Sequence, residues 1–127
     1  MTVKDETIDD ADRTFLNGFE RLRPFVDHLR PMLATNYERA TLLAPDGSRV
    51  TIDINLLCEF GSAEAHASNR VIIESKSASG VGSIDRLLWN MGIRPEPMSK
   101  YACGLAAIRP ELPSNKWHRV IDRHISQ

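Results

Sequence analysis

Two stretches of alternating residues joined by a short turn constrain the fold of this chain most strongly. Residues 36–43 and 49–57 alternate between apolar and polar side chains, which is typical of strands with one buried face. The segment between them, residues 44–48, reads Ala-Pro-Asp-Gly-Ser. Pro at the first turn position and Gly at the third predict a type I turn followed by a left-handed glycine. The sequence therefore predicts an antiparallel hairpin.

This turn sets a register that places Arg39 opposite Asp53 and Tyr37 opposite Asn55. Side chains two residues apart then share a face, so the hairpin has one apolar and one polar face. Two interpretations of the polar face stay open: the solvent side of an antiparallel sheet, or the wall of a binding site. The apolar face carries Ala40, Leu42, Val50, Ile52 and Ile54, and the polar face carries Tyr37, Arg39, Thr41, Arg49, Thr51, Asp53 and Asn55.

Residues 71–77 predict a further strand, because β-branched residues begin it and small residues flank it. In such a strand Glu74 and Lys76 point to the same side, while Val71 and Ile73 point to the other. The pair can be an ion pair on a wet sheet face. It can equally be a site in which the carboxylate holds a metal ion and the ammonium holds an anion.

The composition is that of an ordinary globular protein and excludes some function classes. The chain has 127 residues, enough for one domain or part of one, and a formal net charge of −1. A nucleic-acid-binding protein usually has a basic excess, so we expect no nucleic-acid partner. No apolar run is long enough to span a bilayer, and we expect a cytoplasmic protein without a membrane segment. Cys58 and Cys103 are expected to be reduced core thiols, with a disulfide between them as the open alternative.

The remaining segments predict a leader, helices and loops. We expect residues 1–12 to be a disordered acidic leader and residues 13–127 to form one partial domain. Apolar spacing predicts helix over residues 15–33, with Pro24 beginning a second short helix and Pro31 ending or kinking it. Residues 59–69 are expected to be a loop. Later helices are expected after Ser83, Ser99 and Ser114, each of which would cap the helix that follows it.

Four short motifs occur in order along these predicted elements. They are Tyr37-Glu38-Arg39-Ala40, Arg49-Val50-Thr51-Ile52-Asp53, Ile73-Glu74-Ser75-Lys76 and Ser99-Lys100-Tyr101. They resemble the YxRxA, RVTxD, ExK and SKY motifs of the VTC domain, the catalytic domain of polyphosphate polymerases among the triphosphate tunnel metalloenzymes. The resemblance covers residues 15–108 and implies an α+β fold. Because the family's N-terminal tunnel strands have no counterpart before Tyr37, it implies an antiparallel sheet that forms half of a tunnel barrel, its C-terminal half, flanked by helices.

The resemblance also implies roles for individual residues. Arg39, Arg49 and Lys76 would be the catalytic residues, acting by holding and neutralising phosphates. Ser99 and Lys100 would bind a phosphate at one end of the tunnel. Glu74 would ligate a divalent metal ion, Mn²⁺ or Mg²⁺.

Three functions follow and stay open. The chain can be a metal-dependent phosphotransferase that moves the γ-phosphate of a nucleoside triphosphate to a polyphosphate chain. It can be a non-catalytic module that binds polyphosphate or another polyanion. It can be a scaffold in which Arg39 pairs with Asp53 and Glu74 pairs with Lys76. Because half a barrel leaves open edges, we expect a partner: a second copy in a homodimer, or a separate chain that supplies the N-terminal half.

Overall fold

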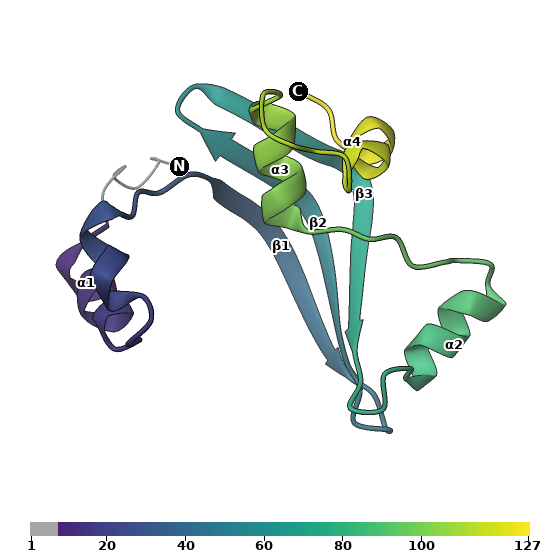
Figure 1. The fold of residues 1–127 in the computed structure, drawn as a ribbon. Helices are drawn as coiled ribbons and strands as arrows, with labels where there is room; N and C mark the ends of the chain where they lie inside the picture. Colours follow the sequence, from purple (N-terminus) through teal and green to yellow (C-terminus); the bar gives the residue numbers. More distant parts are fainter. Residues whose placement is uncertain (1–7) are drawn as a thin grey trace.

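A three-stranded antiparallel sheet forms the centre of the fold (Figure 1). The computed structural model describes residues 8–127. Strands β1 (Ala34–Leu43), β2 (Arg49–Phe60) and β3 (Ala63–Lys76) lie in the order β1-β2-β3. In the described chain five helices accompany the open sheet: α1 (Asp10–Asn17), the 3₁₀ helix η1 (Arg23–His28), α2 (Ser83–Asn90), α3 (Lys100–Ile108) and α4 (His118–His124). The predicted α+β class is confirmed.

The two hairpin turns differ in how well the sequence predicted them. Between β1 and β2 the Gly47 N–H donates to Ala44 O at 2.9 Å, and Gly47 has φ of 79°, as predicted. The predicted loop over residues 59–69 is wrong, because β2 continues to Phe60 and β3 begins at Ala63. A tight turn with Gly61 at φ of 60° joins them, and only glycine adopts such an angle readily.

A bulge in the middle of β2 changes which side chains share a face. Arg39 lies opposite Asp53 as predicted, but Asn36 lies opposite Leu57, so the predicted Tyr37–Asn55 pairing is wrong. Asn55 has φ of 55°, a left-handed conformation that asparagine tolerates better than most residues. The irregularity shifts the alternation of the strand by one residue. As a result odd-numbered polar residues before it and even-numbered apolar residues after it face the same side.

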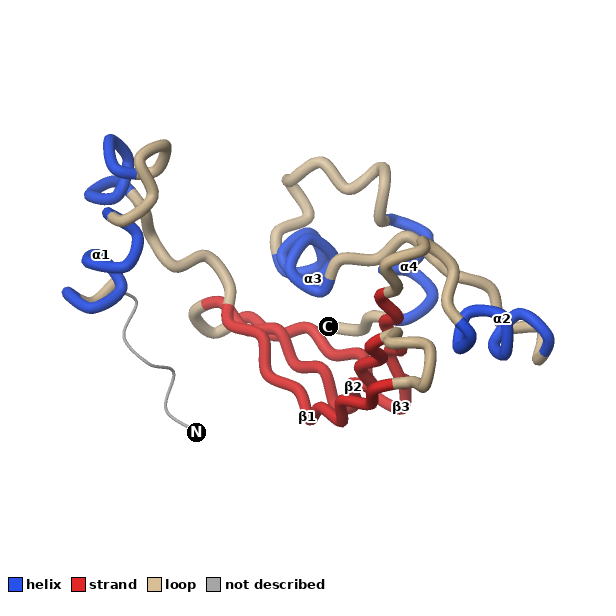
Figure 2. Tube along the Cα trace, turned by 90° about the horizontal axis from the view of Figure 1, so that it is seen from below, coloured by secondary structure: helices blue, strands red, loops and turns tan. Residues whose placement is uncertain are grey.

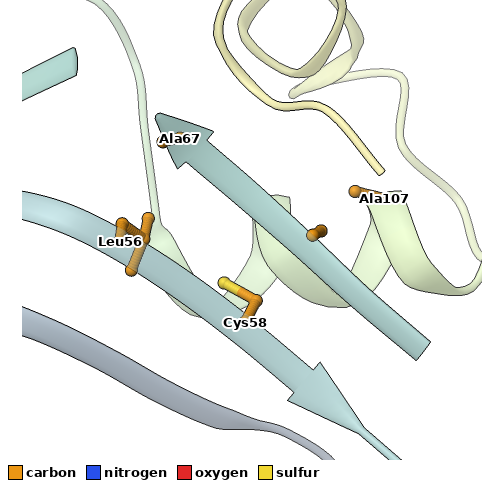
Figure 3. Packing of buried hydrophobic residues seen from close by; sticks show 5 residues of the cluster. Leu56, Cys58, Ala67 and Ala107 are labelled. Carbon is orange, nitrogen blue, oxygen red and sulfur yellow. The ribbon is translucent and has the colours of Figure 1, made fainter. Parts of the chain in front are cut away.

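The core lies on that shared side, beneath α3. Its buried members are Leu56 and Cys58 of β2, two alanines of β3, and Ala107 of α3 (Figure 3). The helix approaches β2 so closely that a Cβ on Gly104 would lie 2.8 Å from the Cβ of Cys58. Small residues on both elements therefore allow α3 to pack directly on the sheet. The cysteines are unpaired, and burial raises the pKa of the Cys58 thiol to about 11.

The face predicted to be apolar is largely uncovered. Leu42 is 55% exposed, Ile73 is 41% exposed and Ile54 is 38% exposed. Figure 2 shows α3 and α4 on one side of the sheet. On the other side Val50 is buried, and Ser75 opposite it donates a hydrogen bond to Asp85 of α2. The hydrophobic pattern of the hairpin thus identified a face correctly but did not identify the face that forms the core.

The N-terminal helices also differ from the prediction. Helix α1 begins at Asp10, inside the segment expected to be a disordered leader, because the Asp9 side chain accepts a hydrogen bond from the Asp12 N–H at 2.8 Å. Residues 1–7 of that leader lie outside the described residues. The first part of the helical stretch predicted over residues 15–33 is shorter than expected, because α1 ends at Asn17. The second short helix predicted at Pro24 is confirmed as the 3₁₀ helix η1, which has Pro24 in its first turn and ends at His28, before Pro31.

The helices after the sheet follow the predicted order, with shifted caps. Gly82 rather than Ser83 precedes α2, and Trp117 rather than Ser114 precedes α4. Ser99 caps α3 as predicted, accepting a hydrogen bond from the Ala102 N–H at 3.2 Å. None of the helices in the described part of the chain is long and apolar enough to cross a membrane.

Candidate phosphate-binding site

The polar side chains of the two predicted hairpin strands and of the Glu74 strand meet in one pocket on the sheet. Pairing across the strands brings them together: Thr51 of β2 lies opposite Thr41 of β1 and opposite Glu74 of β3. The pocket has a volume of about 130 Å³ and is open to solvent. It is lined by Arg39, Thr41, Arg49, Thr51, Glu74 and Lys76.

The pocket is strongly cationic. Three of its side chains are cations, Arg39, Arg49 and Lys76, and one is a carboxylate, Glu74. Arg49 and Lys76 lie directly opposite each other on neighbouring strands, although like charges in that position repel. No described carboxylate pairs with Arg49. An anion between these two cations would relieve their repulsion.

Glu74 is the only carboxylate in the pocket lining. Its Oε1 lies 3.0 Å from Lys76 Nζ, and its Oε2 lies 3.9 Å from Lys100 Nζ. The hydrogen bond from Lys76 holds the pKa of Glu74 below its usual value, with further lowering from the charges of Lys100 and Arg39. Glu74 is therefore ionised at neutral pH and about half exposed, which leaves it free to accept another ligand.

Within the pocket lining, Glu74 is the one acidic side chain that could ligate a divalent metal ion. Among residues 8–127 no group of three or more His, Cys, Asp or Glu side chains is arranged to hold a metal ion. Mg²⁺, however, is commonly held by one or two carboxylates together with waters and substrate phosphates. The oxygen chemistry and exposure of Glu74 suit that mode, in which the protein supplies one ligand and a bound phosphate chain supplies others.

Asp53 lies behind the pocket and is fully buried. Arg39 binds it with two hydrogen bonds, from Nε at 2.6 Å and from Nη2 at 2.8 Å. Lys100 Nζ lies 2.8 Å from the same carboxylate. The hydrogen bond from Arg39 lowers the pKa of Asp53 to about 2, and the nearby Lys100 adds to this lowering. Burial alone would raise the pKa, but its effect is smaller than that of the Arg39 hydrogen bond. The same contact raises the pKa of Arg39 above its usual range.

Ser99 and Lys100 do not line the pocket itself. Lys100 is the first residue of α3 and reaches the site through its contacts with Asp53 and Glu74. The Ser99 hydroxyl is occupied in capping α3. Tyr37 packs its ring against both cations, 4.8 Å from the Arg39 guanidinium carbon and 5.5 Å from Lys100 Nζ.

The Ser- and Gly-rich segment after β3 leads into α2 and has a structural role. Two of its backbone N–H groups bond carboxylates: Ser83 N–H donates to Asp46 at 2.7 Å, and Gly82 N–H donates to Asp85 at 2.7 Å. The bond to Asp46 holds the start of α2 against the first hairpin turn, and the bond to Asp85 caps α2. The absence of a Walker pattern in this segment agrees with that structural role.

Comparison with known families gives a decisive match. The model of the VTC domain family matches residues 2–109 of this chain. The chain belongs to the VTC domain family. This family is associated with polyphosphate and triphosphate-tunnel enzymes. No curated protein and no solved structure matches the chain in the same kind of search.

Within this VTC domain the structure brings together most of the residues that the sequence singled out. Arg39, Arg49, Glu74 and Lys76 share the pocket, and Lys100 lies beside it. Sequence reasoning did not select Asp53 or the threonine Thr51 as site residues. The predicted register already placed Asp53 opposite Arg39, and that pairing was the signal that could have identified it.

The depressed pKa of Asp53 predicts an acid-dependent contribution to stability. In the unfolded chain this carboxyl titrates near its ordinary 3.8, whereas in the folded protein its pKa is about 2. The stabilisation is therefore complete above about pH 4 and is lost as the pH falls through about 2. We expect urea unfolding to show wild type more stable than Asp53→Asn at pH 5, with a gap that narrows below about pH 4. A gap that stays constant down to pH 2 would contradict the prediction.

Proposed function

We propose that this VTC domain supplies one wall of a tunnel that binds a triphosphate or polyphosphate chain. One observation carries the proposal: Arg49 and Lys76 lie directly opposite each other, beside Arg39, in a pocket whose lining has a single carboxylate. Glu74 pairs with Lys76, but no described carboxylate pairs with Arg49, so a bound anion would stabilise this arrangement. Arginine forks and a lysine ammonium are the groups that proteins use to bind phosphate oxygens.

The proposed reaction is transfer of the γ-phosphoryl group of a nucleoside triphosphate to a polyphosphate chain. Such transfer needs positioning and charge stabilisation rather than covalent chemistry by the protein. Arg39, Arg49 and Lys76 would hold the phosphates in line, and Lys100 would add charge at the α3 end of the site. A Mn²⁺ or Mg²⁺ ion, held by Glu74, would neutralise negative charge on the phosphates.

A non-catalytic binding module is the second candidate, and one observation favours it. The sheet has three strands, and the pocket is partly open to solvent rather than enclosed. Catalysis of phosphoryl transfer benefits from a site that excludes water. We therefore propose that this chain by itself binds the phosphate chain without turnover. Association with a second copy, or with a chain that carries the N-terminal half of the tunnel, would complete the enzyme.

Calorimetric titration with inorganic tripolyphosphate, with and without Mn²⁺, tests the binding proposal. The mass of the protein in solution should be measured on the same sample. Binding that weakens with added salt supports the pocket, since exposed charge interactions are screened. No binding at low salt would overturn the proposal. Formation of polymer from ATP would then separate the enzyme from the binding module.

Glu74→Gln is expected to abolish the strengthening of tripolyphosphate binding by Mn²⁺. The variant removes the carboxylate that would ligate the metal, while the amide keeps the shape of the side chain. Binding without metal should persist or improve, because one negative charge leaves the pocket. Glu38→Gln is the matched control, since Glu38 is exposed on β1 and bonds Asn55 outside the pocket. If Mn²⁺ strengthens tripolyphosphate binding by Glu74→Gln as much as binding by wild type, Glu74 is not the metal ligand. If the variant unfolds, the role of Glu74 is structural.

A further inference from the structure

The buried carboxylate of Asp53 connects two cations that come from distant parts of the chain. Arg39 lies in β1 and Lys100 begins α3, and both of them bind Asp53, which is 0% exposed. Both oxygens are used: Oδ1 accepts from Arg39 Nε at 2.6 Å, and Oδ2 lies 2.8 Å from Lys100 Nζ. A carboxylate held in this way restrains the position of both partners.

The two cations are also held from another side. The ring of Tyr37 lies 4.8 Å from the guanidinium carbon of Arg39 and 5.5 Å from Lys100 Nζ. Arg39 uses Nε and Nη2 for Asp53, so its Nη1 has no hydrogen bond within residues 8–127. Arg39 lines the pocket, and Lys100 lies beside it near Glu74. Each cation therefore keeps donor capacity for a ligand while its position is fixed.

We infer that Asp53 is a positioning residue that fixes Arg39 and Lys100, with the ring of Tyr37, in the arrangement that receives the phosphate chain. This inference rests on the proposed function of the same pocket. It assigns a role to a negative charge that, by its sign alone, opposes anion binding. The arrangement matters because long cationic side chains lose rotamer freedom when they bind, and a prearranged pair loses less.

A role limited to charge predicts the opposite result, which makes the inference testable. If Asp53 only lowers the positive potential of the pocket, Asp53→Asn should bind tripolyphosphate more tightly. If Asp53 positions its two partners, the same variant should bind more weakly, even though the pocket gains a net positive charge. The sign of the change in affinity therefore separates the two roles.

The experiment measures metal-free tripolyphosphate affinity for wild type, Asp53→Asn, Lys100→Met and the double variant. Thermal unfolding of each variant establishes the folded fraction at the assay temperature. We expect Asp53→Asn to weaken binding about tenfold and to have a smaller effect in the Lys100→Met background, since coupled residues are not additive. Tyr37→Leu leaves every charge in place and should also weaken binding, whereas Tyr37→Phe keeps the ring and should bind like wild type.

The outcomes distinguish failure of the positioning role of Asp53 from failure of the proposed phosphate-binding function. Equal or tighter binding by Asp53→Asn overturns the inference and leaves the proposed function standing. An undiminished effect in the Lys100→Met background overturns the assignment of Lys100 as a partner that Asp53 positions. If Asp53→Asn does not fold, Tyr37→Leu decides, and unchanged affinity of that variant overturns the inference. Absence of binding by wild type overturns the proposed function and the inference together.

Discussion

Replacing Arg49 by Gln is expected to weaken tripolyphosphate binding about 10- to 100-fold at low salt, the equivalent of roughly 1.5–3 kcal/mol. Arg49 lies opposite Lys76 and makes no ion pair with any described carboxylate. Its removal therefore leaves no buried charge without a partner, and the loss should appear in binding rather than in folding. Titration calorimetry at two salt concentrations measures both the affinity and its salt dependence.

The control for Arg49 is another exposed arginine with the same change of charge. Arg119 lies in α4, is exposed and does not line the pocket. Arg119→Gln should bind tripolyphosphate like wild type, whereas Arg49→Gln should also show a weaker dependence on salt. Equal losses in the two variants would mean that the chain attracts the anion through its overall charge and not through this pocket.

Gly104→Ala is expected to destabilise the fold by about 2–3 kcal/mol, because an added methyl group overpacks the contact between α3 and β2. The new Cβ would collide with the sulfur of Cys58 and would lie 2.8 Å from its Cβ. Cys58 is 1% exposed, so its side chain has little room to move away. Thermal unfolding should show a melting temperature lower by roughly 10 °C.

A second variant links this destabilisation to the stated contact. Cys58→Ala removes the sulfur, so the double variant Cys58→Ala/Gly104→Ala should recover part of the stability lost in Gly104→Ala. Gly104→Ala should also weaken tripolyphosphate binding, because a displaced α3 withdraws Lys100 from Asp53. A Gly104→Ala variant with the stability of wild type would show that α3 can pack on the sheet without this close approach.

These predictions concern a domain whose family is shown by the match of the family model. The chain is a VTC domain, and its fold is an open antiparallel sheet with helices. The pocket supports the proposed function because three cations share it with a single carboxylate.

Local sequence determined the first hairpin and most of the site. The turn over residues 44–48 fixes its own geometry through Pro45 and Gly47, and it thereby sets Arg39 opposite Asp53. Once that register is set, alternation alone places the other polar side chains on one face. The grouping of Arg49 with Lys76 was expected only from the resemblance to the family, since the tight turn that pairs β2 with β3 was not predicted.

Only the tertiary structure decided which part of the sheet is buried. The bulge at Asn55 shifts the alternation, and the close contact of Gly104 with Cys58 places α3 over the end of the sheet beyond the bulge. Most of the apolar face of the hairpin, Val50 excepted, consequently stays exposed, while Asp53 on the polar face becomes fully buried. The physical reason is that alternation depends on neighbours along the strand, whereas burial depends on contacts with segments about fifty residues away, which no local pattern encodes.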